Sequence, residues 1–195
     1  MNAALPSHLR RVVTDGSDRG EWMRARSRGI TATDVAKLST PRSIDAAAWE
    51  KLHGSSFTGN AFTRHGTERE PVIAAWVLRE HGIEPSRALF HAETDMRHLA
   101  TPDGLVLREA GRLELAEIKT TNKAWRTIPR NYMRQIWWQQ YVLGAERTLM
   151  VWERHENFVP VGDPECRWVD RDENEIAKLV GLAGKLIDTL YARTK

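Results

Sequence analysis

The segment from Leu113 to Ile118 constrains the fold of this chain of 195 residues more than any other. Its apolar residues do not keep one strict alternation, because Leu113, Leu115 and Ile118 would lie on both faces of an extended strand. A strand that is apolar on both faces is typical of a buried position inside a sheet. The sequence therefore predicts a central strand covered on both sides, and the charged residues Glu117 and Lys119 in it require an explanation.

Helical and strand patterns around this segment indicate an α+β (mixed α/β) domain. Helical spacing and stop signals predict helices in segments 21–38 (with a turn at Gly29-Ile30), 43–53, 67–81, 131–143 and 172–191. Short β-rich runs predict consecutive strands of one sheet near 89–91, 104–107 and 113–118, and a further strand at 148–152. We therefore expect a central mixed β-sheet flanked by helices.

Residues at the predicted helix ends fit known capping preferences. Thr33 and Ser43 are predicted to be N-caps, because a hydroxyl oxygen there can accept a bond from a backbone N–H. Pro71 fits only the first turn of a helix that begins at Thr67. The small, polar segment 55–60 is predicted to be a mobile loop that does not separate domains.

The length suits a single domain over residues 1–195, in which we expect residues 1–18 to be loosely ordered. Hydrophobic residues make up 41% of the chain, too many for a disordered protein, yet no apolar run reaches the roughly 18 residues of a membrane span.

A lone cysteine, Cys166, and an N-terminus without an apolar signal core are typical of the cytoplasm. One cysteine also excludes a four-cysteine iron–sulfur cluster, so any bound metal needs oxygen or histidine ligands.

Positive charge is concentrated in one segment, although the net charge of +3 does not by itself indicate a nucleic-acid partner. Residues 119–134 contain no acid, and Trp125 and Tyr132 are interleaved with the basic residues Lys119, Lys123, Arg126, Arg130 and Arg134. Such a stripe can contact nucleic-acid phosphates. The alternative is a solvated helix face with its adjoining loop.

Residue types that suit phosphodiester hydrolysis lie at the ends of two predicted strands. Asp103 sits between a proline and a glycine, in a sharp turn that can aim its carboxylate outward. Glu117 and Lys119 are two positions apart, so their side chains project from the same face of a strand. Carboxylates can hold Mg²⁺, which stabilises pentacovalent phosphorus, while lysine positions water or helps to deprotonate it. Either triplet alone is more commonly structural, so their order and separation carry the hypothesis.

The blocks Thr101-Pro102-Asp103-Gly104 and Glu117-Ile118-Lys119 resemble the P-D…E-x-K pattern of a large nuclease superfamily. Over most of residues 20–190 the chain is similar to the phage lambda-type exonuclease, or YqaJ-like viral recombinase, family of the PD-(D/E)xK nucleases. The resemblance implies a restriction-endonuclease-like core with Asp103, Glu117 and Lys119 as catalytic residues. It also implies Mg²⁺, with Mn²⁺ as a substitute, bound by Asp103, Glu117 and the backbone carbonyl of Ile118.

Two N-terminal blocks extend the resemblance. The sequence from Trp22 to Val35 is similar to a family block whose basic and hydroxyl residues bind a DNA phosphate, which implies Arg26 and Thr33. Arg24 or Arg28 could take the place of Arg26, and simple capping is the alternative for Thr33.

The second block, from Gly66 to Pro71, is similar to a family element whose glutamate helps to bind the metal or its water, which implies Glu70. Thr67 and Glu70 also fit a capping box, in which the glutamate would only satisfy backbone N–H groups.

The segment from Tyr132 to Gln140 is similar to the family's Y-x-x-Q-x-Q helix, whose glutamine orients the catalytic lysine or water. This implies Gln135 as a fourth catalytic residue. The pattern's second glutamine falls on Trp137, while Gln139 lies one helical turn beyond Gln135 and faces a similar direction, so its role stays open. Trp137 and Trp138 are expected in the core rather than in the site.

The resemblance implies 5′ to 3′ degradation of linear double-stranded DNA in phage-type recombination, in the host cytoplasm. A single-strand annealing protein is the implied partner, and a homo-oligomer, a trimer in this family, is plausible. One alternative is a structure-specific or restriction-type endonuclease with the same metal centre. The other is a non-catalytic DNA-binding accessory module, although clustered carboxylates without a cation would repel one another.

Overall fold

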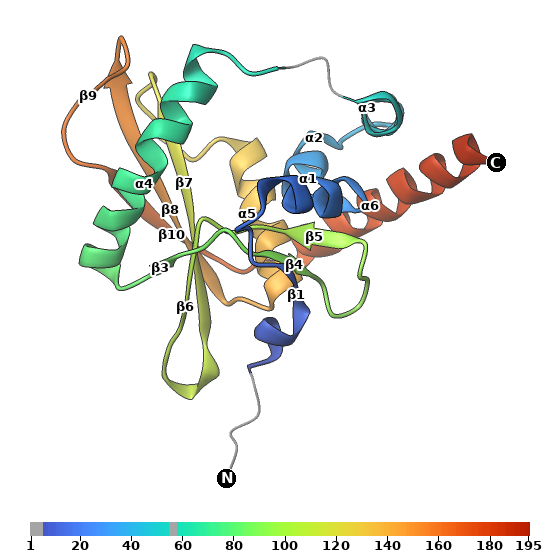
Figure 1. The fold of residues 1–195 in the computed structure, drawn as a ribbon, viewed down its shortest axis with the longest axis horizontal. Coiled ribbons are helices and arrows are strands. Elements are labelled where there is room, and N and C mark those ends of the chain that lie inside the picture. Colours follow the sequence, from blue (N-terminus) through green and yellow to red (C-terminus); the bar gives the residue numbers. More distant parts are fainter. Residues whose placement is uncertain (1–5, 55–57) are drawn as a thin grey trace.

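The computed structural model describes residues 6–54 and 58–195, in which two mixed β-sheets are packed among helices (Figure 1). The larger sheet has the strand order β10-β8-β7-β6-β3, and β9 pairs with β8. Its strands are β3 (Glu84–Pro85), β6 (Gly104–Leu107), β7 (Leu113–Thr121), β8 (Arg147–Glu156), β9 (Val159–Pro160) and β10 (Glu165–Asp170). β7 lies between antiparallel β6 and parallel β8, so the predicted central strand is confirmed.

The smaller sheet has the order β1-β4-β5-β2 and is formed by β1 (Val12–Thr14), β2 (Ile30–Thr31), β4 (Leu89–His91) and β5 (His98–Ala100). The prediction that 89–91 joins 104–107 and 113–118 in one sheet is therefore wrong. Strand β4 pairs instead with β1 and β5, both antiparallel. Local alternation identifies a strand but does not specify its partners, because register depends on distant segments.

Residues 7–14, within the segment that we expected to be loosely ordered, form the short helix η1 (Ser7–Arg11) and β1. The guanidinium of Arg11 is buried and donates to the carbonyl oxygens of Val142 and, at 3.0 Å, Leu143. These carbonyls lie at the C-terminal end of a helix, where a positive charge is favourable. The N-terminal segment is thus attached to the body of the protein by a buried arginine as well as by the pairing of β1 with β4.

The predicted helices are present, with shifted ends: α1 (Arg19–Ser27), α2 (Ala32–Lys37), α3 (Pro41–His53), α4 (Ala61–His81), α5 (Arg130–Leu143) and α6 (Glu173–Thr194). The short helix η2 (Glu109–Gly111) lies between β6 and β7. None of the helices in the described segments is long and apolar enough to cross a membrane.

The two predicted N-caps are wrong. Thr31 caps α2 in a capping box with Asp34, and Thr40 caps α3 in a capping box with Ser43. In each case the hydroxyl that we chose lies inside the first turn, because the residue with extended backbone geometry, which a cap requires, comes earlier in the chain. The predicted stop of α3 at Gly54 is confirmed. Residues 55–57 of the predicted loop lie outside the described residues.

Helix α4 begins at Ala61, capped by Asn60, well before the predicted start at Thr67. Pro71 therefore lies inside the helix rather than in its first turn, which corrects that prediction. The side chain of Thr67 donates to the carbonyl oxygen of Thr63, at 3.1 Å, in the helical interior. The capping-box alternative for Glu70 is excluded, because no helix begins at this position.

Helices cover both faces of the larger sheet (Figure 1). On one face, Ile73 and Val77 of α4 pack against Ala116 and Ile118 of β7. On the other face, α5 joins Leu115 of β7 to a core that also includes side chains of α2, α3 and α6. Since side chains alternate along a strand, Glu117 and Lys119 share the face of Leu115, towards α5.

Candidate active site

Asp103, Glu117 and Lys119 meet at the junction of the two sheets, where Lys119 donates to Glu117 and Asp103 is bonded to the backbone between them. Asp103 lies in the bend between β5 and β6, and its carboxylate Oδ2 accepts the backbone N–H of Ile118 at 2.7 Å. The Lys119 ammonium donates to Glu117 Oε1 and, at 3.1 Å, to the carbonyl oxygen of Ile118. The turn and the strand therefore bring together the three side chains that the sequence placed at strand ends.

A glutamine of α5 fixes the remaining oxygen of Glu117. Gln139 Nε2 donates to Glu117 Oε2 at 2.7 Å, and both side chains belong to residues only 3% exposed. Gln135, the residue selected from the sequence, lines the same cavity, but its side chain makes no hydrogen bond within the described residues. In this geometry Gln139 therefore orients the carboxylate. The sequence signal for this role was that Gln139 lies one helical turn beyond Gln135 and faces a similar direction.

Negative charge is in excess in this cluster. Loss of hydration, together with the charges of Glu117 and Glu70, raises the pKa of Asp103 to about 8, although Lys119 acts in the opposite direction. Burial alone would lower the pKa of Lys119, but the charges of Glu117 and Asp103 outweigh it and raise that pKa. The lysine is therefore a cation, and one cation does not balance three neighbouring carboxylates.

The donor set fits a hard divalent cation, although no group of three or more His, Cys, Asp or Glu residues in 6–54 and 58–195 is placed to hold a metal. Mg²⁺ does not require such a cage, because it keeps several waters and binds through one or two carboxylates and substrate phosphates. Asp103 and Glu117 provide two carboxylates whose mutual repulsion a cation would relieve. Glu70, on α4, lines the same cavity.

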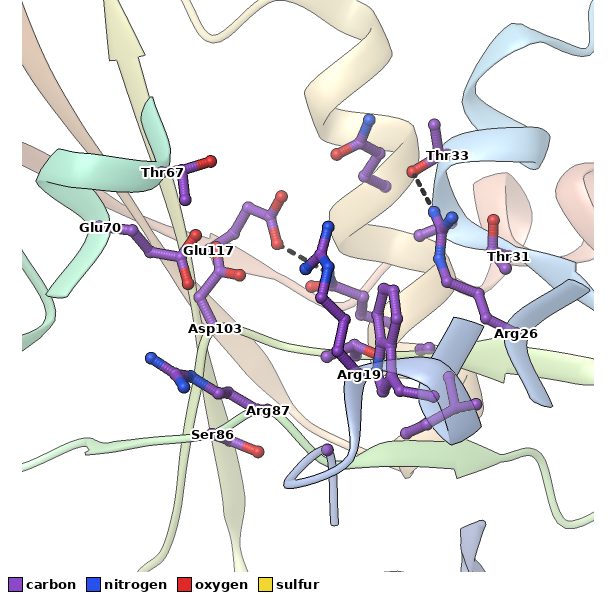
Figure 2. A pocket seen from close by; sticks show the side chains of 18 of the residues that line it. Arg19, Arg26, Thr31, Thr33, Thr67, Glu70, Ser86, Arg87, Asp103 and Glu117 are labelled. Carbon is purple, nitrogen blue, oxygen red and sulfur yellow. Dashed lines mark hydrogen bonds between the residues drawn. The ribbon is translucent and has the colours of Figure 1, made fainter. Parts of the chain in front are cut away.

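The site opens into a polar cavity of about 520 Å³, which contains every side chain assigned from the sequence to catalysis, metal or phosphate (Figure 2). Carboxylates from α4, the β5–β6 bend and β7 line it together with arginines from α1 and from the segment between β3 and β4. Ile118 does not line it, and its carbonyl oxygen accepts from Lys119. A cavity of this size suits a ligand as large as a nucleotide.

Arg26 and Thr33 form a hydroxyl–guanidinium pair on the α1–α2 side of the cavity (Figure 2). Arg26 Nη2 donates to Thr33 Oγ1 at 3.1 Å, and its guanidinium carbon lies 5.2 Å from the ring centroid of Trp22. Arg24 and Arg28, the two alternatives, do not line the cavity. The structure thus brings together the two residues that the resemblance pairs as a phosphate contact.

The basic stripe of residues 119–134 does not form one surface. Lys119 is directed into the cavity, while Arg130 forms an ion pair with Glu175 at 3.6 Å. Arg134 donates to the carbonyl oxygens of Val35, at 3.2 Å, and Leu38. Arg134 is thus used inside the fold, while Arg130 forms an ion pair at the surface.

Two cavity arginines, Arg19 and Arg87, have no counterpart among the residues chosen from the sequence. Neither lies in a motif, since Arg19 precedes a helix signal and Arg87 stands alone before a short strand. Only the proximity of β1 and β4 brings them to one cavity.

The comparisons with known proteins agree with this geometry. An alkaline exonuclease, LHK-Exo, from Laribacter hongkongensis is 25% identical with a TM-score of 0.71, over 89% of this chain and 93% of that one. The structure of LHK-Exo in complex with dAMP is 26% identical with a TM-score of 0.70, at the same coverage.

A phage-related exonuclease from Haemophilus somnus 129PT shares the fold at 14% identity and a TM-score of 0.61, over 86% of this chain and 96% of that one. No curated protein sequence matches. The mixed architecture is thus that of phage-type exonucleases with the PD-(D/E)xK fold, and the neighbours support a phage-type nuclease.

A family model provides the assignment. The model of the YqaJ-like viral recombinase domain matches residues 21–146, which is more than half of the chain. The matched range includes the hydrogen-bonded pair Arg26 and Thr33 of α1 and α2, the carboxylates and lysine of the site, and the glutamines of α5. By this match, the chain belongs to the family of the YqaJ-like viral recombinase domain.

Proposed function

We propose that this chain is a Mg²⁺-dependent deoxyribonuclease that hydrolyses linear double-stranded DNA from the 5′ end towards the 3′ end. The observation that carries the proposal is that Asp103, Glu117 and Lys119 line one polar cavity, in which Lys119 donates to Glu117 and Asp103 accepts the backbone N–H of Ile118 between them. Similarity to an alkaline exonuclease, including its complex with dAMP, favours DNA as the substrate.

The reaction would add water to phosphorus and break the bond to the leaving sugar oxygen, which then takes up a proton. Mg²⁺, when bound by Asp103 and Glu117, supplies stabilisation of the pentacovalent charge. Lys119 remains an ammonium and orients the attacking water or stabilises the phosphoryl oxygens. Gln139 holds Glu117 in one orientation, and Glu70 can bind a water of the metal.

Substrate binding would depend on the opposite part of the cavity. Arg26 and Thr33 provide a guanidinium and a hydroxyl for a phosphate of the DNA strand. By family resemblance, the enzyme would act in phage-type recombination in the host cytoplasm. There it would produce single strands for an annealing protein, and it could work as a homo-oligomer.

The decisive experiment compares linear duplex DNA with the same DNA as a closed circle, in Mg²⁺ and in EDTA. We expect degradation of the linear form in Mg²⁺ or Mn²⁺, none in EDTA, and no attack on the circle. Lys119→Met, which keeps the length of the side chain but removes its charge, should abolish degradation. Cleavage in EDTA, or cleavage by Lys119→Met at the wild-type rate, would contradict the proposed chemistry.

The same experiment separates the alternatives. Cleavage of the closed circle would indicate an endonuclease with the same metal centre. Retention of DNA without any turnover would indicate a binding module. Duplex DNA with a label at one 5′ end or one 3′ end gives the direction, because a 5′ to 3′ enzyme releases the 5′ label first.

A further inference from the structure

Two arginines of the cavity, Arg19 and Arg87, have no function in the chemistry described above. Both line the cavity together with Asp103 and Glu117, and both residues are exposed. Within the part of the chain that the structure describes, neither forms an ion pair or a side-chain hydrogen bond. Two free guanidinium groups therefore face the cavity beside an acidic cluster.

The fold brings these arginines together from positions far apart in the sequence. Thr14 of β1 is paired with Leu89 of antiparallel β4, so the chain two residues beyond Thr14 passes the chain two residues before Leu89. At this point Gly16 has a φ of +79°, and a Cβ built on it would lie 2.3 Å from the carbonyl oxygen of Arg87. Only glycine allows this approach, which places the start of α1 beside Arg87.

The two aspartates that precede Arg19 are already used for local backbone structure. Asp15 accepts the backbone N–H of Ser17 at 2.8 Å, and Asp18 caps α1 by accepting the N–H of Glu21 at 3.0 Å. Neither acid neutralises Arg19 through an ion pair within the described residues. Its positive charge is therefore available to a ligand.

The two arginines approach the carboxylates from different directions (Figure 2). The Arg87 side chain extends towards Glu70 and Asp103, while the Arg19 side chain extends between Glu117 and Arg26. A nucleic-acid strand carries a phosphate at every nucleotide, so a strand that places one phosphate at the carboxylates must place its neighbours nearby. Those neighbouring phosphates face an acidic cluster and need cations that no carboxylate already holds.

We propose that Arg19 and Arg87 bind the two phosphates that flank the scissile one, Arg87 on the Glu70 side and Arg19 on the Arg26 side. This inference rests on the proposed function and adds a path for the cleaved strand through the cavity. A guanidinium can hold a phosphate through two parallel hydrogen bonds. Contacts of this kind position the strand without reading its sequence.

The test measures DNA affinity against salt concentration for Arg19→Gln and Arg87→Gln. All proteins carry Asp103→Asn and are kept in EDTA, so that a fluorescent duplex with single-stranded overhangs stays intact. We expect each substitution to weaken binding by about tenfold for any base sequence. The slope of log affinity against log salt should fall by about 0.7 to 0.9 for each lost contact.

Arg112→Gln is the matched control, because this exposed arginine in the β6–β7 connection does not line the cavity. It should leave the affinity and the slope unchanged, and Arg19→Lys and Arg87→Lys should restore most of the slope. The inference would be overturned if the slopes for Arg19→Gln and Arg87→Gln equalled that of the control. A melting temperature equal to that of the parent protein would show that the variants are correctly folded.

A separate assay with Asp103 intact distinguishes this failure from that of the proposed function. If the otherwise wild-type chain degrades linear DNA in Mg²⁺ while the slopes do not change, only the path of the strand is wrong. If it neither binds nor degrades DNA, both proposals fail.

Discussion

Glu114 and Glu117 lie three residues apart on β7, and each is only 3% exposed, yet their surroundings are opposite. Glu114 faces the α4 side and accepts from two arginines, Arg108 at 2.9 Å and Arg147 at 2.6 and 2.8 Å. Burial alone would raise its pKa, but the two arginines outweigh burial and lower it. This glutamate is a fully compensated structural ion.

Glu117 faces the α5 side and shares a single lysine with other carboxylates. The pKa of the neighbouring Asp103 is raised to about 8, because burial and two negative charges oppose its ionisation. The positive charge around Glu114 thus exceeds its own negative charge, whereas the positive charge around Glu117 does not neutralise the carboxylates beside it. The comparison teaches that an uncompensated carboxylate, rather than a buried one, marks the place for a cation.

The largest expected effect is a loss of activity when a carboxylate beside Glu117 is removed, which has no counterpart around Glu114. Asp103→Asn should reduce DNA cleavage at least ~10³-fold, because it removes a carboxylate that would hold the metal. Above pH 8, where Asp103 is ionised in the metal-free wild type, the melting temperature of the metal-free variant should equal or exceed that of the wild type, because the substitution removes a repelling charge. Cleavage rates and thermal denaturation in EDTA measure these effects. A large fall in melting temperature would show that the acidic cluster stabilises the fold.

Mg²⁺ should bind at Asp103 and Glu117, and not at Glu114, and should thereby stabilise the folded protein. At a Mg²⁺ concentration of about 100 times Kd, the free energy of unfolding should rise by about 2.7 kcal/mol. Thermal denaturation with and without Mg²⁺ measures this shift, which should disappear in Asp103→Asn and persist in Glu114→Gln. A shift of equal size in Asp103→Asn would place the metal elsewhere.

The cluster of Glu114 with Arg108 and Arg147 should respond in the opposite way, with a loss of stability and no loss of activity. Glu114→Gln should destabilise the protein by about 2 kcal/mol and lower the melting temperature by about 4 to 8 °C, with normal cleavage. The cost is below that of a fully buried pair, because the side chains of Arg108 and Arg147 are 32% and 40% exposed. Glu109→Gln, at an exposed position in η2, is the control and should change neither quantity.

The smallest expected effect concerns the glutamine that orients Glu117. Gln139→Leu should reduce cleavage about tenfold and weaken Mg²⁺ binding by a similar factor, as for other residues that support a metal ligand. Titration of Mg²⁺ by calorimetry measures the second effect, which a purely structural residue would not show. Gln139→Glu adds a fourth negative charge and should not restore activity. Normal metal affinity in Gln139→Leu would assign it to packing alone.

Much of the site could be predicted from local sequence, because backbone geometry fixes local side-chain directions. The period of two along a strand places Glu117 and Lys119 on one face, and their contact in the structure confirms it. The proline and glycine around Asp103 mark a turn, and its carboxylate does reach β7. For the same reason the positions of the helices were largely predictable.

Register, helix starts and pairings between distant segments were not predictable. The capping-box interpretation of Glu70 failed because α4 begins at Ala61, which depends on an earlier cap at Asn60. The choice between Gln135 and Gln139 depends on how α5 is rotated against β7, since both lie on a similar helix face. A rotation of this kind follows from core packing along the whole helix.

The sequence by itself determined which acids and which lysine share one strand face in this protein, because residue type and strand spacing are local features. Only the tertiary structure decided the charge balance, since Glu114 and Glu117 look alike in sequence but meet different partners. It also brought Arg19 and Arg87 to one cavity, where Gly16 lets the chain before α1 pass close to the backbone of Arg87. Electrostatic interactions depend on distances through space, and those distances exist only once the chain has folded.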